Sequence, residues 1–373
     1  MSSAMVKLGD VINVHYGKAL KADQRVSNGS VHVFGSSGIV GNHDKTLCSY
    51  PTIIIGRKGS VGAITWAPDG GWIIDTAYYV EIKDNNKLDL RYLFYILSGI
   101  DLTKKTITTS IPGLNRDDLY DTFIKLPPFE EQKRIVDLLD KAEGIRQKRD
   151  QAIKLADDFL RATFLAMFGD PVENPKRWDV ASLLEYGSFK NGMNFTKGES
   201  GSVLKCLGVG NFKSLATITC MDNIGEIELN TLPSDDYLLK DGDIVFVRSN
   251  GNKALVGRCL TIYPGKEKVT FSGFCIRYRI ENTAITPEYL NFLFRTPSMK
   301  QQMLSGGQGA NIQNISQSTL SALRIPVPPL DKQIAFAKLV DFHASIVKKQ
   351  YDKMAESEKL FNALTGDFFT FNE

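Results

Sequence analysis

Two short stretches decide the fold: Leu126-Pro127-Pro128-Phe129-Glu130-Glu131-Gln132 and, 201 residues later, Val327-Pro328-Pro329-Leu330-Asp331-Lys332-Gln333. Proline is tolerated in the first turn of a helix, where its missing N–H would have no intrahelical partner, and acidic side chains suit the positive end of a helix dipole. Each stretch therefore predicts the start of a helix. Because the glutamine recurs as well, the two stretches indicate two copies of one unit.

Other blocks recur in the same order along the chain, which is the signature of an internal repeat. Ile53-Ile54-Ile55-Gly56-Arg57 matches Ile244-Val245-Phe246-Val247-Arg248, and Arg91–Leu97 matches Glu288–Phe294. We expect an α+β protein in which two α/β domains alternate with two long helices. The predicted bounds are residues 1–125 and 170–325 for the domains and residues 126–169 and 326–373 for the helices.

The two predicted helices each carry apolar side chains at alternating steps of three and four residues, which places them on one face. At 1.5 Å per residue such a helix is roughly 60 Å long. The side chains expected to pair the helices are Ile135, Leu138, Ala142, Ile145 and Phe159 in the first and Ala337, Ala344, Val347, Tyr351, Met354 and Phe361 in the second.

A long helix with a single apolar face needs a partner, and each copy supplies one for the other. We expect an antiparallel coiled coil in which Phe168 lies near Phe336, Gln151 near Lys353 and Ile135 near Phe369. Such pairing predicts that the two domains lie at opposite ends of a rod. In the alternative arrangement each helix packs only on its own domain.

Within the domains, short runs rich in β-branched and aromatic residues are separated by Gly, Asn and Asp turns, which predicts strands. An amphipathic helix is expected in each copy, near Leu90–Leu97 and Pro287–Phe294. The predicted strands are Thr52–Ile55, Trp72–Ile74 and Ala77–Ile82 in the first domain and Val203–Leu207, Asp243–Arg248 and Phe271–Ile280 in the second.

Composition excludes several classes of protein. The chain has 373 residues, of which 43% are hydrophobic and 23% charged, so it is not disordered or low in complexity. It has no apolar run of about 18 residues and no secretory signal pattern, so we expect a cytoplasmic protein without membrane contact. The five cysteines form no C-x-x-C pair and the four histidines show no ligand spacing. We therefore expect buried free thiols, no metal and no cofactor.

The formal charge of +3 says little about nucleic acid, but several loops combine glycine with basic or amide side chains. Glycine lets the backbone approach a phosphate, while Arg, Lys, Asn and Gln donate to phosphates or base edges. The alternative for each is an ordinary solvated turn. The candidates are Lys18, Lys21, Arg57, Lys58, Ser60, Lys104, Lys105 and Thr109 in the first domain and Lys190, Asn191, Asn194, Lys197, Arg248, Asn250, Asn252, Lys253, Gln308, Asn311 and Gln313 in the second.

No catalytic pattern accompanies these loops. The chain has no G-x-x-x-x-G-K-[ST] loop, no G-x-S-x-G elbow and no [DNS]-P-P-[YFW] motif of an amino-methyltransferase. Leu126-Pro127-Pro128-Phe129 lacks the leading Asn or Asp of that last motif and opens a helix instead. The repeat therefore favours a binding protein over an enzyme.

The doubled Pro-Pro helix starts and the junction Met167-Phe168-Gly169-Asp170-Pro171-Val172-Glu173-Asn174-Pro175-Lys176-Arg177-Trp178 resemble the DNA-specificity subunit of a bacterial type I restriction-modification system. The resemblance covers essentially the whole chain. It implies two target-recognition domains, each of which reads half of a bipartite DNA site, held apart by an antiparallel helix pair. It also implies that the helices dock two modification subunits, which carry the methylation chemistry, and that restriction subunits then join.

The two blocks differ in size and in loop chemistry, so we expect an asymmetric target on double-stranded DNA. The sequence leaves three alternative functions open. One is a stand-alone bipartite DNA-binding regulator, a second is the recognition subunit of a related modification system, and a third is a coiled-coil scaffold without affinity for DNA.

Overall fold

The computed structural model describes residues 4–105, 113–196, 198–212, 216–305 and 314–369, with the side chains of some residues in these ranges left undescribed. It divides into two units. Unit 1 comprises Met1–Asp150 and Tyr351–Glu373, and unit 2 comprises Gln151–Gln350. Each unit contains one α/β domain and part of both long helices. We call these domains domain 1 and domain 2.

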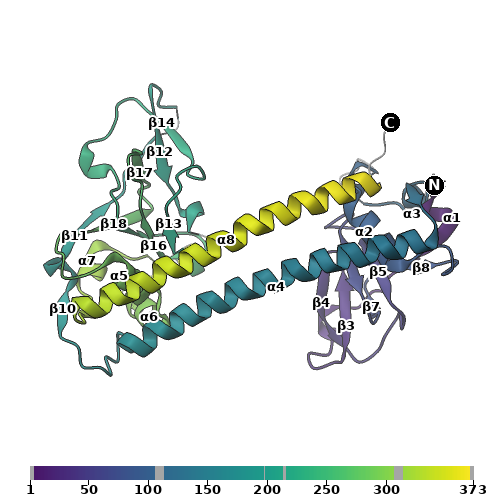
Figure 1. Ribbon diagram of the computed structural model, residues 1–373, viewed down its shortest axis with the longest axis horizontal. Coiled ribbons are helices and arrows are strands. Elements are labelled where there is room, and N and C mark those ends of the chain that lie inside the picture. Colours follow the sequence, from purple (N-terminus) through teal and green to yellow (C-terminus); the bar gives the residue numbers. More distant parts are fainter. Residues whose placement is uncertain (1–3, 106–112, 197, 213–215, 306–313, 370–373) are drawn as a thin grey trace. The chain divides into compact units, whose positions relative to one another are not determined.

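Domain 1 contains a four-stranded sheet in the order β2-β8-β5-β6, a three-stranded sheet in the order β4-β3-β7, and the pair β1-β9 (Figure 1). Its strands are β1 Ala4–Lys7, β2 Ile12–Tyr16, β3 Val31–Gly35, β4 Gly38–His43, β5 Thr52–Gly56, β6 Ile64–Ala67, β7 Trp72–Ile73, β8 Ala77–Ile82 and β9 Phe123–Leu126. Its helices are α1 Leu8–Val11, α2 Leu90–Gly99 and α3 Arg116–Tyr120, with 3-10 turns η1 Ala22–Gln24 and η2 Leu102–Lys105.

Domain 2 repeats this plan with a five-stranded sheet in the order β11-β18-β15-β16-β13, a three-stranded sheet β14-β12-β17 and the pair β10-β19. Its strands are β10 Val180–Ser182, β11 Gly187–Asn191, β12 Ser202–Leu207, β13 Thr217–Ile218, β14 Glu226–Leu229, β15 Asp243–Val247, β16 Cys259–Ile262, β17 Val269–Phe271, β18 Cys275–Ile280 and β19 Arg324–Pro326. Its helices are α5 Pro287–Arg295, α6 Pro297–Ser305 and α7 Gln317–Ser321, with 3-10 turns η3 Leu183–Glu185, η4 Val209–Asn211, η5 Asp235–Tyr237 and η6 Lys253–Leu255.

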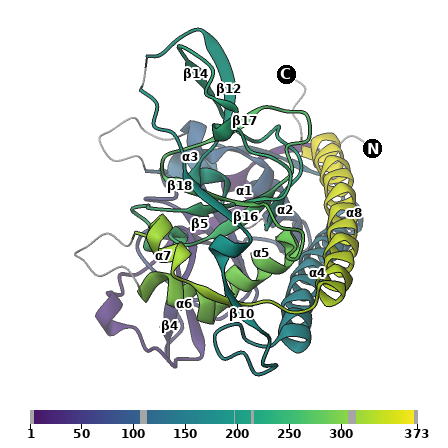
Figure 2. The same ribbon diagram turned by 90° about the vertical axis from the view of Figure 1, so that its left-hand side faces the viewer.

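The central strand of each larger sheet is apolar on both faces because both faces are covered. In β15, Ile244 and Phe246 point to a core shared with α5, while Val245 and Val247 point to the core beneath the three-stranded sheet. Figure 2 shows α5 of domain 2 on the side of the sheet that carries α4 and α8. In β5, Ile54 likewise faces a different core from its two neighbours. An unbroken apolar run is the expected sequence of such a strand.

The structure confirms the predicted strands and domain helices within one or two residues at most ends. The expected run Phe271–Ile280 is the exception, because it divides into β17 and β18 around the turn at Ser272–Phe274. The first and last strands of each domain pair antiparallel, with Ala4 opposite Leu126 and Val180 opposite Pro326. The chain therefore enters and leaves each domain at the same edge.

The two long helices begin directly after the Pro-Pro pairs, as the sequence predicts: α4 spans Phe129–Phe168 and α8 spans Leu330–Phe369. A fully buried glutamine holds the start of each. Gln132 donates from Nε2 to the carbonyl oxygens of Lys87 (2.7 Å) and Pro127 (2.9 Å), and its Oε1 accepts from the N–H of Asp89 (2.8 Å). Asp89 is the residue that caps α2.

Gln333 repeats this arrangement in domain 2. Its Nε2 donates to the carbonyl oxygens of Ala284 (3.1 Å) and Pro328 (2.7 Å), and its Oε1 accepts from the N–H of Thr286 (2.9 Å), which caps α5. The recurrent glutamine of the sequence therefore ties each long helix to the cap of a domain helix. We call Gln132 and Gln333 the glutamine pins.

The long helices pack together antiparallel, as predicted. In unit 2 the rings of Phe168 and Phe336 lie 5.6 Å apart, and Asp157 pairs with His343 at 3.0 Å. In unit 1 the Nη1 of Arg149 donates to the carbonyl oxygen of Lys353 at 2.9 Å. Residue numbers thus rise along α4 as those of their partners fall along α8. Gln151 and Lys353 belong to different units, and the Phe369 side chain is not among those described.

The two ends of α4 pack into the cores of different domains. Ile135 is buried, but in the core of domain 1, while Leu160, Phe164 and Phe168 enter the core of domain 2. The first turns of α4 therefore pack on domain 1, whereas its last turns pack on domain 2, so the alternative in which each helix packs only on its own domain is wrong for α4.

Five predicted pairing side chains are exposed and not buried in a seam. They are Leu138 (43% exposed), Ile145 (48%), Phe159 (67%), Tyr351 (51%) and Ala344. On α4 the reason is that the domain cores bury the neighbouring Leu139 and Leu160 instead. Ala142, Ala337, Val347 and Met354 are partly buried, and the Phe361 side chain lies outside the described ones.

The junction after α4 is a compact turn. The indole Nε1 of Trp178 donates to the carbonyl oxygen of Phe168 at 3.0 Å, and Asn174 exchanges two hydrogen bonds with the backbone of Trp178. Its Asn and Trp thus close the C-terminus of α4. Among the described helices, none is long and apolar enough to cross a membrane.

Candidate nucleic-acid interface

Two segments of domain 1 that the sequence singled out meet a third, the segment before α3, at the start of β8. Gly17, next to Lys18, donates its N–H to the carbonyl oxygen of Ala77 (3.1 Å), and the N–H of Arg57 donates to that of Thr76 (2.9 Å). The carbonyl oxygen of Arg57 in turn accepts from the N–H of Leu114 (3.0 Å). The turn after β2, the glycine loop after β5 and the segment before α3 therefore share one end of the sheet.

Domain 2 repeats this convergence at the start of β18. Gly192 donates to the carbonyl oxygen of Cys275 (3.0 Å), and Arg248 donates to that of Phe274 (2.8 Å). The carbonyl oxygen of Arg248 accepts from the N–H of Ile315 (3.0 Å). Isolated bridges join Lys58 to Gly113 and Ser249 to Asn314, so the same two loops meet in both copies.

The glycine loops need left-handed backbone at matching positions. Gly62 and Gly257 both have φ of +75°, a conformation that L side chains rarely adopt. In both copies the glycine follows a valine, so the recurrent Val-Gly of the sequence marks a turn that only glycine forms without strain. This turn fixes the direction in which the loop presents its side chains.

The structure places most described candidates at these sheet ends. Lys18 and Lys58 are exposed and Arg57 and Arg248 are partly buried, while Lys21 opens η1 on the surface. The remaining described candidates lie in loops at the surface or in the strand next to them: Ser60, Lys190, Asn191, Asn194, Asn250, Asn252 and Lys253. Asn250 and Asn252 accept backbone N–H groups of their own loop, at 2.7 and 3.0 Å.

Several candidates belong to the undescribed part of the chain or have undescribed side chains. Thr109, Lys197, Gln308, Asn311 and Gln313 lie outside the described residues, and Lys104 and Lys105 close η2 but their side chains are not described. In both copies the first described residue after the undescribed loop bridges to the glycine loop: Gly113 in domain 1 and Asn314 in domain 2.

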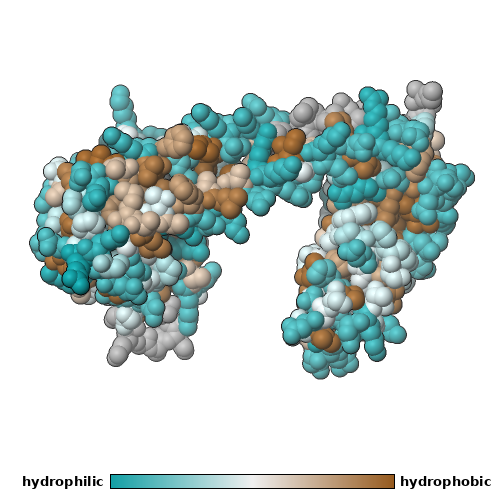
Figure 3. Space-filling view, turned by 60° about the horizontal axis from the view of Figure 1, so that its bottom comes forward, coloured by the Kyte–Doolittle hydropathy of each residue, from teal (hydrophilic) through white to brown (hydrophobic). Residues whose placement is uncertain are grey.

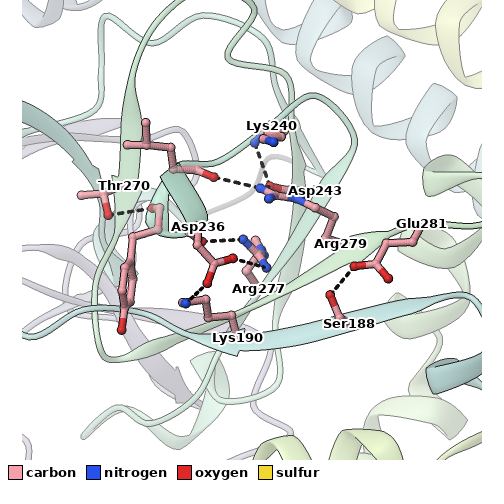
Figure 4. A network of polar contacts seen from close by, with 11 residues as sticks. Ser188, Lys190, Asp236, Lys240, Asp243, Thr270, Arg277, Arg279 and Glu281 are labelled. Atoms are coloured by element: carbon pink, nitrogen blue, oxygen red, sulfur yellow. Dashed lines mark hydrogen bonds and ion pairs between the residues drawn. The ribbon is translucent and has the colours of Figure 1, made fainter. Parts of the chain in front are cut away.

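Lys190 differs from the other candidates because the protein already neutralises it. Its ammonium pairs with Asp236 of η5 and lies 4.1 Å from the ring centroid of Tyr237. Figure 4 shows Asp236 between Lys190 and Arg277, which come from neighbouring strands β11 and β18. Lys190 is therefore not a free solvated lysine, because a partly exposed ion pair with Asp236 compensates its charge.

The same polar network continues to the far edge of β15. Arg279 makes a bidentate pair with the buried Asp243, at 2.9 Å from Nε and 2.6 Å from Nη2 (Figure 4). Its hydrogen bond to Asp243 raises the pKa of Arg279, whereas burial lowers the pKa of Arg277. These groups attach the η5 segment to the sheet.

Sequence reasoning missed two side chains of domain 1, Tyr16 and Arg116. Tyr16 ends β2 and is 47% exposed, and Arg116 is the first residue of α3. The guanidinium carbons of Arg57 and Arg116 lie 5.0 and 5.3 Å from the Tyr16 ring centroid. Position within the repeat was the available signal, because each residue adjoins a segment already selected. Among the described residues, no group of three potential metal ligands gathers anywhere.

Comparison with known proteins identifies the class. A family model described as the type I restriction modification DNA specificity domain matches residues 2–155 and 195–353. The type I restriction enzyme MjaVIII specificity subunit of Methanocaldococcus jannaschii is 25% identical over 304 residues, which cover 75% of this chain and 70% of that protein.

Solved structures share the fold. The S subunit of a type I restriction-modification system from M. genitalium covers 100% of both chains with a TM-score of 0.60 and 17% identity. A chain from work on complex assembly and conformational transition of the type I R-M system gives a TM-score of 0.57 and 19% identity, and covers 98% of this chain and 97% of that one.

The chain belongs to the type I restriction-modification DNA specificity family. It is the DNA specificity subunit of such a system, a non-catalytic component that works within a type I complex on DNA.

Proposed function

We propose that each domain reads one half of an asymmetric bipartite DNA target. One observation supports this proposal above all: in both domains the same loops hydrogen-bond to the start of one strand, at Thr76–Ala77 in domain 1 and at Phe274–Cys275 in domain 2. Basic and amide side chains therefore gather at one end of the sheet in each domain. Duplicate scaffolds with different loop side chains favour two different half-sites. The candidates for phosphate and base contacts are the described loop residues, with Lys190 as the weakest because Asp236 neutralises it.

The long helices set the number of unread base pairs between the half-sites. Two binding modules joined by a stiff connection act as one ligand when the connection matches the distance between their sites. Major grooves on one side of a duplex recur about every 34–36 Å. A continuous helix of 40 residues, about 60 Å long, is long enough to span that distance.

The helices also dock two modification subunits, and restriction subunits then join the complex in the cytoplasm, where the cell's DNA is. Support for docking comes from large apolar side chains that the long helices leave exposed. In unit 2, Phe159 is 67% exposed and Phe342 is 65% exposed. Figure 3 shows such hydrophobic side chains at the surface of the helices. Exposed apolar patches of this kind mark protein–protein contacts.

The proposal is tested by mapping methylated adenines across the genome of the native host, with and without this gene. We expect a motif with two unequal half-sites around a fixed gap, and we expect it to vanish on deletion. A motif that survives deletion, or a palindromic one, contradicts the proposal.

A further inference from the structure

Two arginines of domain 1 share one exposed aromatic ring. Arg57 follows β5 and Arg116 begins α3, so they are 59 positions apart in the chain. Their guanidinium carbons lie 5.0 and 5.3 Å from the centroid of Tyr16, within the range of cation–π attraction. Tyr16 in turn packs edge-on against the buried Tyr78, whose ring centroid is 5.0 Å away. Both positive charges therefore lie against the same exposed ring.

Within the described part of the chain, no carboxylate neutralises these charges. Arg57 donates from Nη1 to the backbone carbonyl oxygen of Asp75 (3.2 Å), and neither arginine has a carboxylate oxygen within 4.0 Å. Neither Asp75, whose carbonyl oxygen accepts from Arg57, nor Asp117, which follows Arg116 in the chain, forms an ion pair with these arginines. The Nε of Arg116 is buried and has no hydrogen-bond partner among the described residues.

Arg91 of the same domain shows the ordinary structural use of a stacked arginine. Its guanidinium carbon lies 4.8 to 5.0 Å from the centroids of Trp66, Phe94 and Tyr95. Its Nε also donates to Asp140 Oδ1 at 2.9 Å, so its charge is compensated. Holding two like charges together without such a carboxylate costs energy, which an external anion would recover.

We propose that Arg57, Arg116 and Tyr16 form a clamp for one DNA backbone phosphate. The two guanidinium groups bind the phosphate oxygens, and the Tyr16 ring holds both groups in place. The clamp lies where the three segments of domain 1 meet, and it rests on the proposed function of that domain. It fixes the position of domain 1 on the duplex and reads no base.

Among the described residues of domain 2, the equivalent positions do not form such a clamp. The positions equivalent to Tyr16, Arg57 and Arg116 by their hydrogen bonds and helix caps are Asn191, Arg248 and Gln317. Domain 2 keeps one guanidinium, that of Arg248. The amide of Asn191 stands in place of the Tyr16 ring, and the amide of Gln317 stands in place of the Arg116 charge. The two domains therefore hold DNA by different chemistry, and Gln317 provides a matched control in the other copy.

The test uses the complete chain in complex with its modification subunits and measures affinity for cognate and unrelated duplexes over a range of salt concentrations. Each phosphate contact contributes about 0.9 to the slope of log affinity against log salt. We expect R57Q/R116Q to lower the affinity for both duplexes about tenfold and to reduce the slope by about 1.

Control variants separate the clamp from general damage. R91Q removes a stacked arginine whose charge Asp140 already compensates, and Q317A alters the equivalent position of domain 2, so both should keep the parental slope. R57Q alone reports on the clamp if R116Q does not fold, because the one backbone group to which the Arg57 guanidinium donates, among the described contacts, is the carbonyl of Asp75.

Two results overturn the clamp. One is an unchanged salt slope in R57Q/R116Q, and the other is a loss of affinity for the cognate duplex alone, which would assign these arginines to base readout. Both leave the proposed function standing. That function fails separately if the parental complex does not distinguish the two duplexes.

Discussion

At the scale of single residues, the glutamine pins show how one side chain fixes a joint. Each satisfies three backbone groups and is itself fully buried, so all of its hydrogen-bonding atoms have partners. A buried polar group costs free energy unless it is paired, and the same holds for the backbone groups that it serves. The recurrence of Gln132 as Gln333 is therefore explained by geometry at the start of the helix.

Replacing a pin by leucine should destabilise its unit. In Q132L and Q333L, two carbonyl groups and one N–H lose their partner, and we expect the free energy of unfolding to fall by about 2–4 kcal/mol. Q151L, at an exposed position of α4, is the matched control and should change it by less than about 0.5 kcal/mol. Chemical denaturation measures all three. Equal stability of Q132L and Q151L would show that the pin contributes nothing.

The cysteines give a second prediction at this scale. Burial raises the pKa of Cys206 to about 11 and that of Cys259 and Cys275 to about 12, so these thiols stay protonated at pH 8. Cys48 is also buried, with a raised pKa, and Cys220 is exposed. A thiol reagent at pH 8 should modify one cysteine in the folded protein and five after unfolding. Rapid modification of a second thiol in the folded protein would contradict the described packing.

The raised pKa values of the buried thiols also make the free energy of unfolding depend on pH. A thiol whose pKa is higher in the folded state than in the unfolded state contributes stability that is present below the unfolded pKa of about 9 and is lost as the pH rises toward the folded value. We expect the free energy of unfolding to fall above pH 9, and to fall less steeply in C259A/C275A. An identical slope in the parent and the double variant would contradict this prediction.

At the scale of elements, the sequence predicted the helices better than their contacts. Pro-Pro starts and long stretches with few glycines or prolines define α4 and α8, whatever the tertiary structure. The apolar pattern did not distinguish adjacent positions such as Leu138 and Leu139. One reason is that a straight helix has 3.6 residues per turn, so a stripe with a seven-residue repeat rotates slowly around it. The other is that the cores of both domains bury side chains of the same helix. The core of domain 1 buries Leu139, and Leu138 stays exposed.

The same limit applies to the candidate site. Loop composition identified Arg57 and Arg248, and the repeat predicted that their loops correspond. Arg116 lies in a five-residue helix with no composition signal, and its place beside Tyr16 follows only from the hydrogen bond between Leu114 and Arg57. Nor does the sequence show that Asp236 neutralises Lys190, because the two are 46 residues apart.

Helix α8 carries two phenylalanines with opposite predicted roles. Phe336 is fully buried and its ring lies 5.1 to 5.6 Å from those of Phe164, Phe168 and Phe292, so F336A should lower the free energy of unfolding by about 3–5 kcal/mol. F342A removes an exposed ring and should leave stability within about 0.5 kcal/mol. Binding assays should show F342A weakening the association with modification subunits. Undiminished association would remove Phe342 from the docking surface.

At the scale of the whole molecule, the chain consists of two copies of one unit whose side chains have diverged. Both domains share a sheet plan, a Val-Gly turn, a glutamine pin and a meeting of loops. They differ in the side chains that these shared features display, such as Arg116 against Gln317. A common scaffold with different side chains predicts two half-sites of unlike sequence separated by a gap that neither domain reads.

The measurement that tests this most directly is a methylome of cells in which α4 and α8 are each lengthened by four residues at facing positions. Four residues add about 6 Å of helix. We predict that both half-sites keep their sequences while the gap between them grows by about one or two base pairs. An active complex that methylates sites with the original gap would contradict the role of the helices as the connection that sets the spacing.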